Sequence, residues 1–141
     1  MGMDITSANA ILVLKCSLFN ATLQQFSADT MYEGEDDQVA ETRIGVDGKM
    51  VAGQTPNIKA ITLHLEASSP SVEYLNLLKQ SMEKNRKIYE CTMVISIPSI
   101  GKRITYSHGV LQSAKDLPDA KKILDPTSWT FHFQDKSVET M

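Results

Sequence analysis

Three histidines and two cysteines are the side chains best suited to bind a metal ion or to act as nucleophiles. His64, His108 and His132 fall in different strand-like runs and share no short spacing, so a metal site would need the fold to bring them together. Cys16 and Cys91 both lie inside apolar runs, where free cysteines are usually buried and inert. We therefore expect two reduced, buried thiols, and neither a metal nor a cofactor.

Three other short patterns are candidates for binding phosphate, calcium or a substrate. Gly101-Lys102 lacks the upstream glycine of a phosphate-binding loop and is expected to form a turn. The acidic run at 33–37 lacks the alternation and the following glutamate of an EF-hand loop. Ser69 has no histidine near it in the sequence and precedes a proline, as helix caps do. No catalytic constellation emerges, so the sequence predicts that the protein is not an enzyme.

One segment has the spacing of an amphipathic helix. Apolar residues recur at three- and four-residue steps from Val72 to Met82. Ser69 supplies an N-cap hydroxyl, and Pro70 suits the first helical position because its fixed φ is already helical. The pattern predicts one helix at about 70–85 with Ser69 and Pro70 as its structural cap.

Most of the remaining chain alternates apolar and polar residues with the period of a β-strand. Together with the helix, these runs predict a mainly β fold, a sandwich or barrel of about seven or eight antiparallel strands with the helix on one flank. The clearest runs are 61–67, 89–97 and 129–134, and further strands are expected at 10–18, 22–32, 39–46 and 103–114.

Residues 30–57 fit poorly into a compact core. An acidic stretch and a stretch rich in Gly, Gln, Asn and Pro flank a weak strand there. The segment predicts an extended hairpin that stands away from the body and needs a neighbouring surface, because a lone hairpin is only marginally stable in water. We expect a single domain over 1–141, with flexible termini at 1–9 and 135–141.

Length and composition are those of one soluble globular domain. The chain has 141 residues, 42% of them hydrophobic and 22% charged. Its 14 basic and 17 acidic residues give a formal charge of −3, which argues against tight binding of phosphate groups. No apolar run is long enough to cross a membrane. The first four residues lack the basic region of a signal peptide, so we expect the chain to stay in a reducing cytosol.

Three stretches resemble a known family. Residues 44–48 (IGVDG) keep a G-x-D-G turn, and Thr62 to Leu75 keeps the pattern T-x-x-L-x-x-x-S-P-x-x-x-x-L. Residues 129–131 (WTF) supply a late strand in the expected order. These segments resemble the tail-tube proteins of contractile-tailed, myovirus-type bacteriophages, whose fold is similar to that of the type VI secretion tube protein.

The resemblance implies a structural virion protein. Six subunits would join their sheets edge to edge in a ring, and rings would stack into an inner tail tube that conducts DNA during ejection. The implied partners are further copies of the chain, the tail sheath protein, baseplate or tube-initiator and tail-terminator proteins, and, without tight binding, the tape-measure protein and DNA in the lumen. The implied location is the virion tail, assembled in the host bacterial cytoplasm, with no membrane. A tube-initiator or baseplate component of the same fold and a small ligand-binding β-barrel remain alternatives.

The resemblance, together with the physics of sheet edges, predicts which residues take part in assembly. Open sheet edges favour pairing, and a heterologous contact either closes into a ring or continues as a helix. A polar or acidic lining would let DNA slide, because it has no positive charges that bind the phosphates by displacing their counterions. The candidate inter-ring or inter-subunit hairpin residues are Glu35, Asp36, Asp37, Val39, Asp47 and Gly48, and the candidate lumen residues are Thr62, His64, Glu66, Glu90 and Thr92.

Overall fold

The computed structural model of the chain describes residues 10–24, 26, 31–54 and 56–140. Within these residues the chain forms nine strands and one α-helix, and every strand pairing is antiparallel. The mainly β fold with one helix is therefore confirmed. The elements are β1 (Ile11–Cys16), β2 (Asn20–Thr22), β3 (Tyr32–Gly34), β4 (Glu41–Ile44), β5 (Met50–Gly53), β6 (Lys59–Leu65), α1 (Ser71–Asn85), β7 (Cys91–Ile97), a 3-10 turn (Pro98–Ile100), β8 (Lys102–Lys115) and β9 (Thr127–Thr140).

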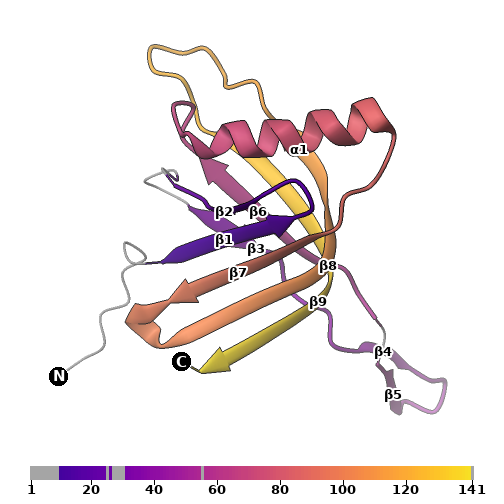
Figure 1. Cartoon of the computed structure of the whole chain (residues 1–141). Coiled ribbons are helices and arrows are strands. Elements are labelled where there is room, and N and C mark those ends of the chain that lie inside the picture. The colour runs from indigo at the N-terminus through magenta and orange to yellow at the C-terminus, as the bar shows by residue number, and fades with distance from the viewer. Residues whose placement is uncertain (1–9, 25, 27–30, 55, 141) are drawn as a thin grey trace.

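Seven of the strands form one sheet in the order β2-β1-β7-β8-β9-β6-β3, and β4 and β5 form a separate ribbon. The sheet is curled, and α1 lies across one of its ends (Figure 1). An isolated bridge between Phe26 and Leu65 ties the chain after β2 to the end of β6. The architecture is thus a single curled sheet rather than a two-sheet sandwich. The long strands β8 and β9 pair along their whole length and continue from one side of the curl to the other.

The apolar residues of the alternating strands point into the curl and form the core. Trp129, Phe131 and Phe133 of β9 are fully buried, while the residues between them lie on the outer face. Leu12 and Leu14 of β1 join them from across the sheet. These side chains fill the interior of the curl.

Helix α1 is fastened to the chain after β2 by two serines at its start. Ser69 Oγ accepts a hydrogen bond from the Ser71 N–H at 3.2 Å and donates one to the carbonyl of Gln24. Ser71 Oγ accepts a hydrogen bond from the Gln24 N–H at 2.7 Å. The helix begins at Ser71, one residue after the predicted start, with Pro70 already in helical conformation before it. At its other end Arg86 adopts the left-handed conformation and closes the last turn.

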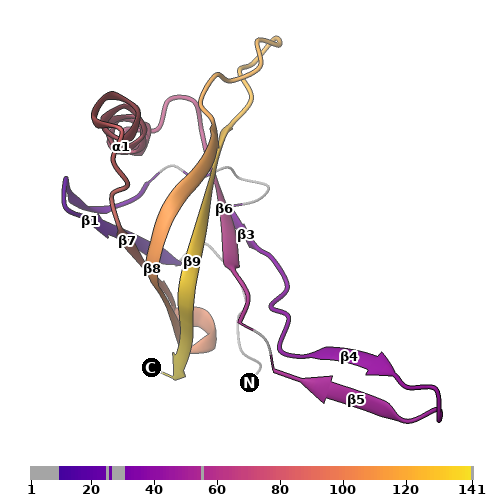
Figure 2. The same ribbon diagram turned by 90° about the vertical axis from the view of Figure 1, so that its right-hand side faces the viewer.

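Two expectations about the ends of elements are wrong. Residues 135–140 are not a flexible tail, because β9 runs to Thr140 and pairs there with Lys102 of the equally long β8. The projecting hairpin is also shorter than 30–57, since β3 pairs with β6 in the main sheet and only β4 and β5 stand away from the body (Figure 2). The expected flexible terminus at 1–9 lies outside the described residues.

Candidate assembly surfaces

The β4–β5 hairpin is held together by its own strand pairing and a tight turn. Ile44 pairs with Met50, and Glu41 with Gly53 at the other end. Gly48 has a φ of 81°, which suits glycine, and its N–H donates to the carbonyl of Gly45. Asp47 Oδ1 accepts a hydrogen bond from the Lys49 N–H at 3.0 Å. Asp47 and Gly48 thus shape the tip of the hairpin.

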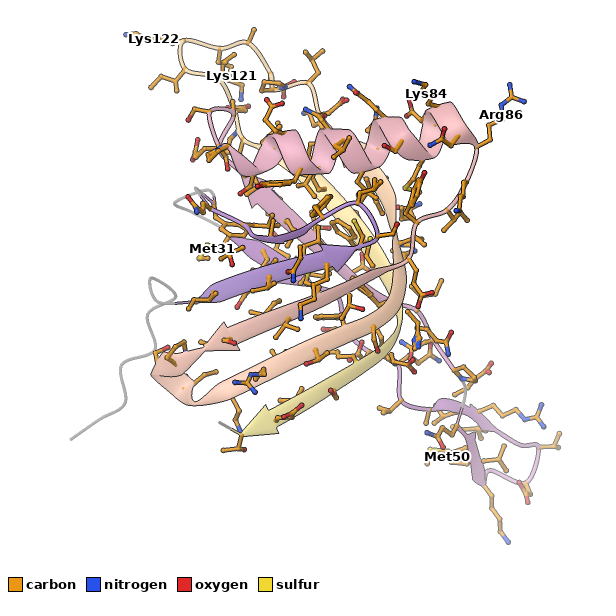
Figure 3. All side chains as sticks on the ribbon, viewed as in Figure 1. Met31, Met50, Lys84, Arg86, Lys121 and Lys122 are labelled. Carbon is orange, nitrogen blue, oxygen red and sulfur yellow. The ribbon has the colours of Figure 1, made fainter. Side chains whose placement is uncertain are left out.

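The hairpin carries apolar side chains that its own fold leaves in water. All residues of β4 and β5 are exposed, with Ile44 at 74% and Met50 at 66% of full exposure. Val46 and Val51 are exposed as well. Figure 3 shows Met50 on the hairpin, away from the curled sheet. The turn residues were predicted to take part in assembly and these four side chains were not, although apolar residues in a segment with no core to join would have indicated them.

The acidic stretch before the hairpin is exposed along most of its length but is attached to the body at two points. The Glu35 N–H donates to the carbonyl of Ala60 in β6 at 3.0 Å. Asp37 Oδ2 lies 3.1 Å from Lys136 Nζ of β9. The Lys136 ammonium also lies 5.5 Å from the centre of the Tyr106 ring. Residues 35 and 37 therefore anchor the base of the hairpin, while Asp36 and Val39 remain exposed.

This anchor perturbs the ionisation of its members. Burial raises the pKa of the Tyr106 hydroxyl, and the neighbouring Lys136 charge opposes that rise only in part. Burial is the largest single effect and would lower the pKa of Lys136, but the hydrogen bond to Asp37 and the interactions with Tyr106 together outweigh it, and the pKa is raised. Lys136 is therefore held in its charged form between a carboxylate and an aromatic ring.

Strand β9 leaves part of one edge open. Strand β6 pairs with β9 only as far as Lys59 opposite Phe133. Beyond that point, residues 135–140 pair with β8 on one side, and no strand of the described chain pairs with them on the other. Val138 is 58% exposed in this stretch. An edge with free backbone groups can accept another strand.

The candidate lumen residues divide between two parts of the molecule. Thr62 and His64 lie on the outer face of β6, where the Thr62 and Thr130 hydroxyls are 3.0 Å apart. His64 Nδ1 lies 3.2 Å from Ser128 Oγ, and its Nε2 lies 3.6 Å from a Glu33 carboxylate oxygen. Thr92 lies on the outer face of β7, with β8 and β9 between it and β6.

The two candidate glutamates lie outside the strands. Glu66 directly follows β6, and its carbonyl accepts a hydrogen bond from the Ser69 N–H. Glu90 directly precedes β7, 3.8 Å from His108 Nδ1, which is also 3.6 Å from an Asp135 carboxylate oxygen. The structure thus gathers Thr62 with His64 and separates them from Glu90 and Thr92.

Within the described ranges, no group of three or more His, Cys, Asp or Glu side chains is arranged to hold a metal ion. In the same part of the chain, no helix combines the length and apolar character needed to cross a bilayer.

Solved structures with the same fold come from contractile injection systems. A chain of the anti-feeding prophage baseplate matches with a TM-score of 0.61 at 14% identity, covering 99% of this chain and 98% of that one. A chain of the anti-feeding prophage tube-terminating cap matches with a TM-score of 0.63 at 9% identity, covering 100% and 94%. A chain of the PVC extracellular contractile injection system, in its sheath–tube complex, matches with a TM-score of 0.61 at 11% identity, covering 92% and 88%. No curated protein sequence matches significantly.

A curled antiparallel sheet with one flanking helix, shared over nearly the whole chain with these structures, defines a protein with the phage tail-tube-like fold, as the sequence predicted. The family model of tail fiber protein gp32 matches residues 3–137, and the chain belongs to that family. Membership of this family supports a structural role in a tail.

Proposed function

We propose that the chain is the subunit of the inner tube of a contractile tail, with six copies closing a ring and rings stacking into a hollow tube. The whole chain would act as one tube domain. Three features support this assignment: the tail-tube-like fold, the open edge of β9 and the unsupported hairpin. A ring needs a heterologous contact that closes, and a stack needs a second contact along the axis. The β9 edge and the hairpin are two separate surfaces that suit these two contacts.

The exposed apolar side chains of the hairpin carry the proposal. Ile44 and Met50 face each other across the ribbon and lie in water in the isolated chain. A two-stranded ribbon has too little buried surface to be stable alone, so contact with a neighbouring copy would stabilise it. Asp47 and Gly48 form the turn of the hairpin, and Asp36 and Val39 precede β4; all four are proposed as part of the contact. Glu35 and Asp37 are proposed instead to set the direction in which the hairpin leaves the body.

The outer face of the sheet is proposed as the wall of the lumen. Thr62, His64 and Thr92 would line it, with Glu66 and Glu90 near its borders. These side chains are polar or acidic, and such a wall attracts few phosphate groups, so DNA and the tape-measure protein would pass without tight binding. The sheath, baseplate or tube-initiator and terminator proteins would bind elsewhere on the tube, in a virion tail assembled in the host cytoplasm. The role is structural, with no catalysis.

Electron microscopy of purified full-length protein tests the hairpin contact. The wild-type chain at high concentration, or with added tail nucleators, is expected to form rings or tubes. Ile44→Asp is expected to remain monomeric, because a carboxylate would have to be desolvated in the contact. Ile123→Asp is the matched control, since Ile123 is also exposed but lies between β8 and β9, and it should assemble like the wild type. Tubes formed by Ile44→Asp would refute the role of the hairpin.

A baseplate or tube-initiator role is the second candidate, favoured by the match to a chain of the anti-feeding prophage baseplate over 98% of that chain. The name of the family adds a tail fibre as a third location. Antibody labelling of intact particles separates the three. Label along the whole tail core after sheath contraction supports the tube, whereas label confined to the tail tip or to fibres would overturn it. Quantitative mass spectrometry measures the number of copies per particle, which is high for a tube subunit and equals the copies in a single ring for an initiator.

A further inference from the structure

The two cysteines, far apart in the sequence, lie opposite each other in the sheet. Cys16 is the last residue of β1 and Cys91 the first of β7, and the two are direct partners in the register of these strands. The strands lie side by side in Figure 1. Both cysteines are free thiols in the structure. None of the assembly contacts proposed above involves them.

Backbone hydrogen bonds show which kind of antiparallel pair they form. The Cys16 N–H donates to the carbonyl of Phe19 at 2.9 Å, and the carbonyl of Leu12 accepts from the Leu23 N–H. Residues 12 and 16 of β1 therefore direct their backbone groups toward β2 and away from β7. Cys16 and Cys91 thus form a non-hydrogen-bonded pair, in which Cα atoms are about 4.5 Å apart and side chains approach most closely. That separation lies inside the range of about 4.4–6.8 Å that a disulfide needs.

The surroundings of the two thiols differ. Cys91 is 1% exposed and donates a weak hydrogen bond to the carbonyl of Tyr89 at 3.6 Å. Burial, and after it the adjacent Cys16 thiol, raises the pKa of Cys91 to about 12. Cys16 is only partly buried, so a small oxidant reaches it first.

We propose that Cys16 and Cys91 form an intramolecular disulfide that fastens β1 to β7 when the protein meets a small-molecule disulfide such as oxidised glutathione. The Cys16 thiolate attacks the small disulfide, forms a mixed disulfide and releases one glutathione thiol. Cys91 then loses its proton and attacks Cys16 Sγ, which breaks the bond to glutathione and releases the second thiol. The protein loses two electrons and two protons, and one glutathione disulfide is reduced to two thiols.

The crosslink would join the β1–β2 end of the sheet covalently to its centre. It closes a loop that contains β2 to β6 and α1, so it removes conformational freedom from a large part of the unfolded chain. The chain would thus be less stable in the reducing cell than in an oxidising medium.

Intact-mass spectrometry of the full-length protein tests the proposal. Reduced protein is incubated with oxidised glutathione at pH 8, denatured and alkylated. The expected product has lost two hydrogens, carries no alkyl group, and gives a crosslinked peptide containing both cysteines. The oxidised form should melt on the order of 10 °C higher than the reduced form. Closure should speed up about tenfold per pH unit below the pKa of the attacking thiol.

Two kinds of variant serve as controls. In Cys91→Ser the reaction should stop at the mixed disulfide between Cys16 and glutathione. If Cys91→Ser does not fold, Cys91→Ala is used in its place. Cys16→Ser/Cys91→Ser should melt at the same temperature with and without oxidised glutathione. Two alkylated thiols, a mixed disulfide that persists in the wild type, or covalent dimers alone would each overturn the proposal.

Discussion

Gly109 lies where β8 changes register against β7. Cys91 pairs with Gly109 and Met93 with Tyr106, so β8 has an extra residue between these pairs. His108 absorbs the irregularity with a φ of 56°, a value uncommon for residues other than glycine. A Cβ atom at residue 109 would lie 2.5 Å from the carbonyl oxygen of His132 and 2.2 Å from the Phe133 ring. Strand β8 thus has a bulge at this point, and glycine is required at 109 because β9 approaches so closely.

Gly109→Ala is therefore expected to destabilise the monomer by about 3 kcal/mol, because backbone and a buried ring must both move. Urea unfolding monitored by tryptophan fluorescence measures the change. Gly53→Ala is the matched control, since nothing lies within 4 Å of a Cβ atom there, and it should stay within about 0.5 kcal/mol of the wild type. Equal effects of the two substitutions would contradict the close approach.

The Cys91 thiol predicts how the reduced protein responds to alkaline pH. Its folded pKa of about 12 exceeds its ordinary value of 9.0, so between these values the folded state keeps a proton that the unfolded state has lost. The contribution of Cys91 to stability is full below pH 9 and is lost as the pH rises toward 12. We expect urea midpoints, measured with a reductant at pH 8, 9 and 10, to fall less in Cys91→Ser than in the wild type. Burial also raises the pKa of Tyr32 and Tyr106, and their share of the loss is the same in both proteins.

At the scale of elements, α1 and the β4–β5 hairpin differ in whether the monomer buries their apolar residues. Leu75 and Leu78 of the helix are fully buried, because their three-residue step places them on the side that faces the sheet. The hairpin forms a regular strand pair but buries no side chain. The helix is thus stabilised within the monomer, whereas the hairpin has surface left for a partner.

Leu75→Ala and Leu78→Ala are each expected to cost about 2–5 kcal/mol, from lost burial and from the cavity left behind. Leu77→Ala, on the same helix but 48% exposed, should change stability by less than about 0.5 kcal/mol. Chemical denaturation of the three variants gives the comparison. Similar losses in all three would mean that α1 does not pack as described.

At the scale of the whole molecule, the chain has a packed body, made of the curled sheet and α1, and a projecting arm, the β4–β5 hairpin. The core lies in the curled sheet, in α1 and at Leu23 directly after β2, and it contains no residue of β4 or β5. The arm joins the body next to the Asp37–Lys136 ion pair, which lies on the body side of the hairpin. If the hairpin makes the proposed contact, folding and assembly depend on different residues.

Replacing residues 41–53 by a short Gly-Ser linker is accordingly expected to leave the thermal midpoint of the monomer within about 2 °C of the wild type, because no buried apolar surface is removed. Differential scanning calorimetry measures the midpoint. A longer deletion of residues 34–54 should be less well tolerated, since it also removes Glu35 and Asp37 from the body. A large loss of stability in the shorter deletion would show that the arm packs on its own monomer.

The sequence alone determined the local features of this protein. The alternation in 61–67, 89–97 and 129–134 predicted both the strands and the faces that are buried, because the two-residue period is a property of each strand by itself. The three- and four-residue steps of the leucines after Ser69-Pro70 predicted the start of the helix to within one residue, because helical periodicity is also a local property. The G-x-D-G turn and the T-x-x-L-x-x-x-S-P pattern were enough to indicate the tail-tube-like fold.

Only the tertiary structure decided which distant segments meet. Residues 135–140 look like a polar tail in the sequence, but they form a strand because β8 offers them an equally long partner. Asp37 and Lys136 are 99 positions apart, and Cys16 and Cys91 are 75 apart, so no local period could relate them. Strand order and register are set by which edges remain free once the core has closed, and that is a property of the whole chain rather than of any one segment.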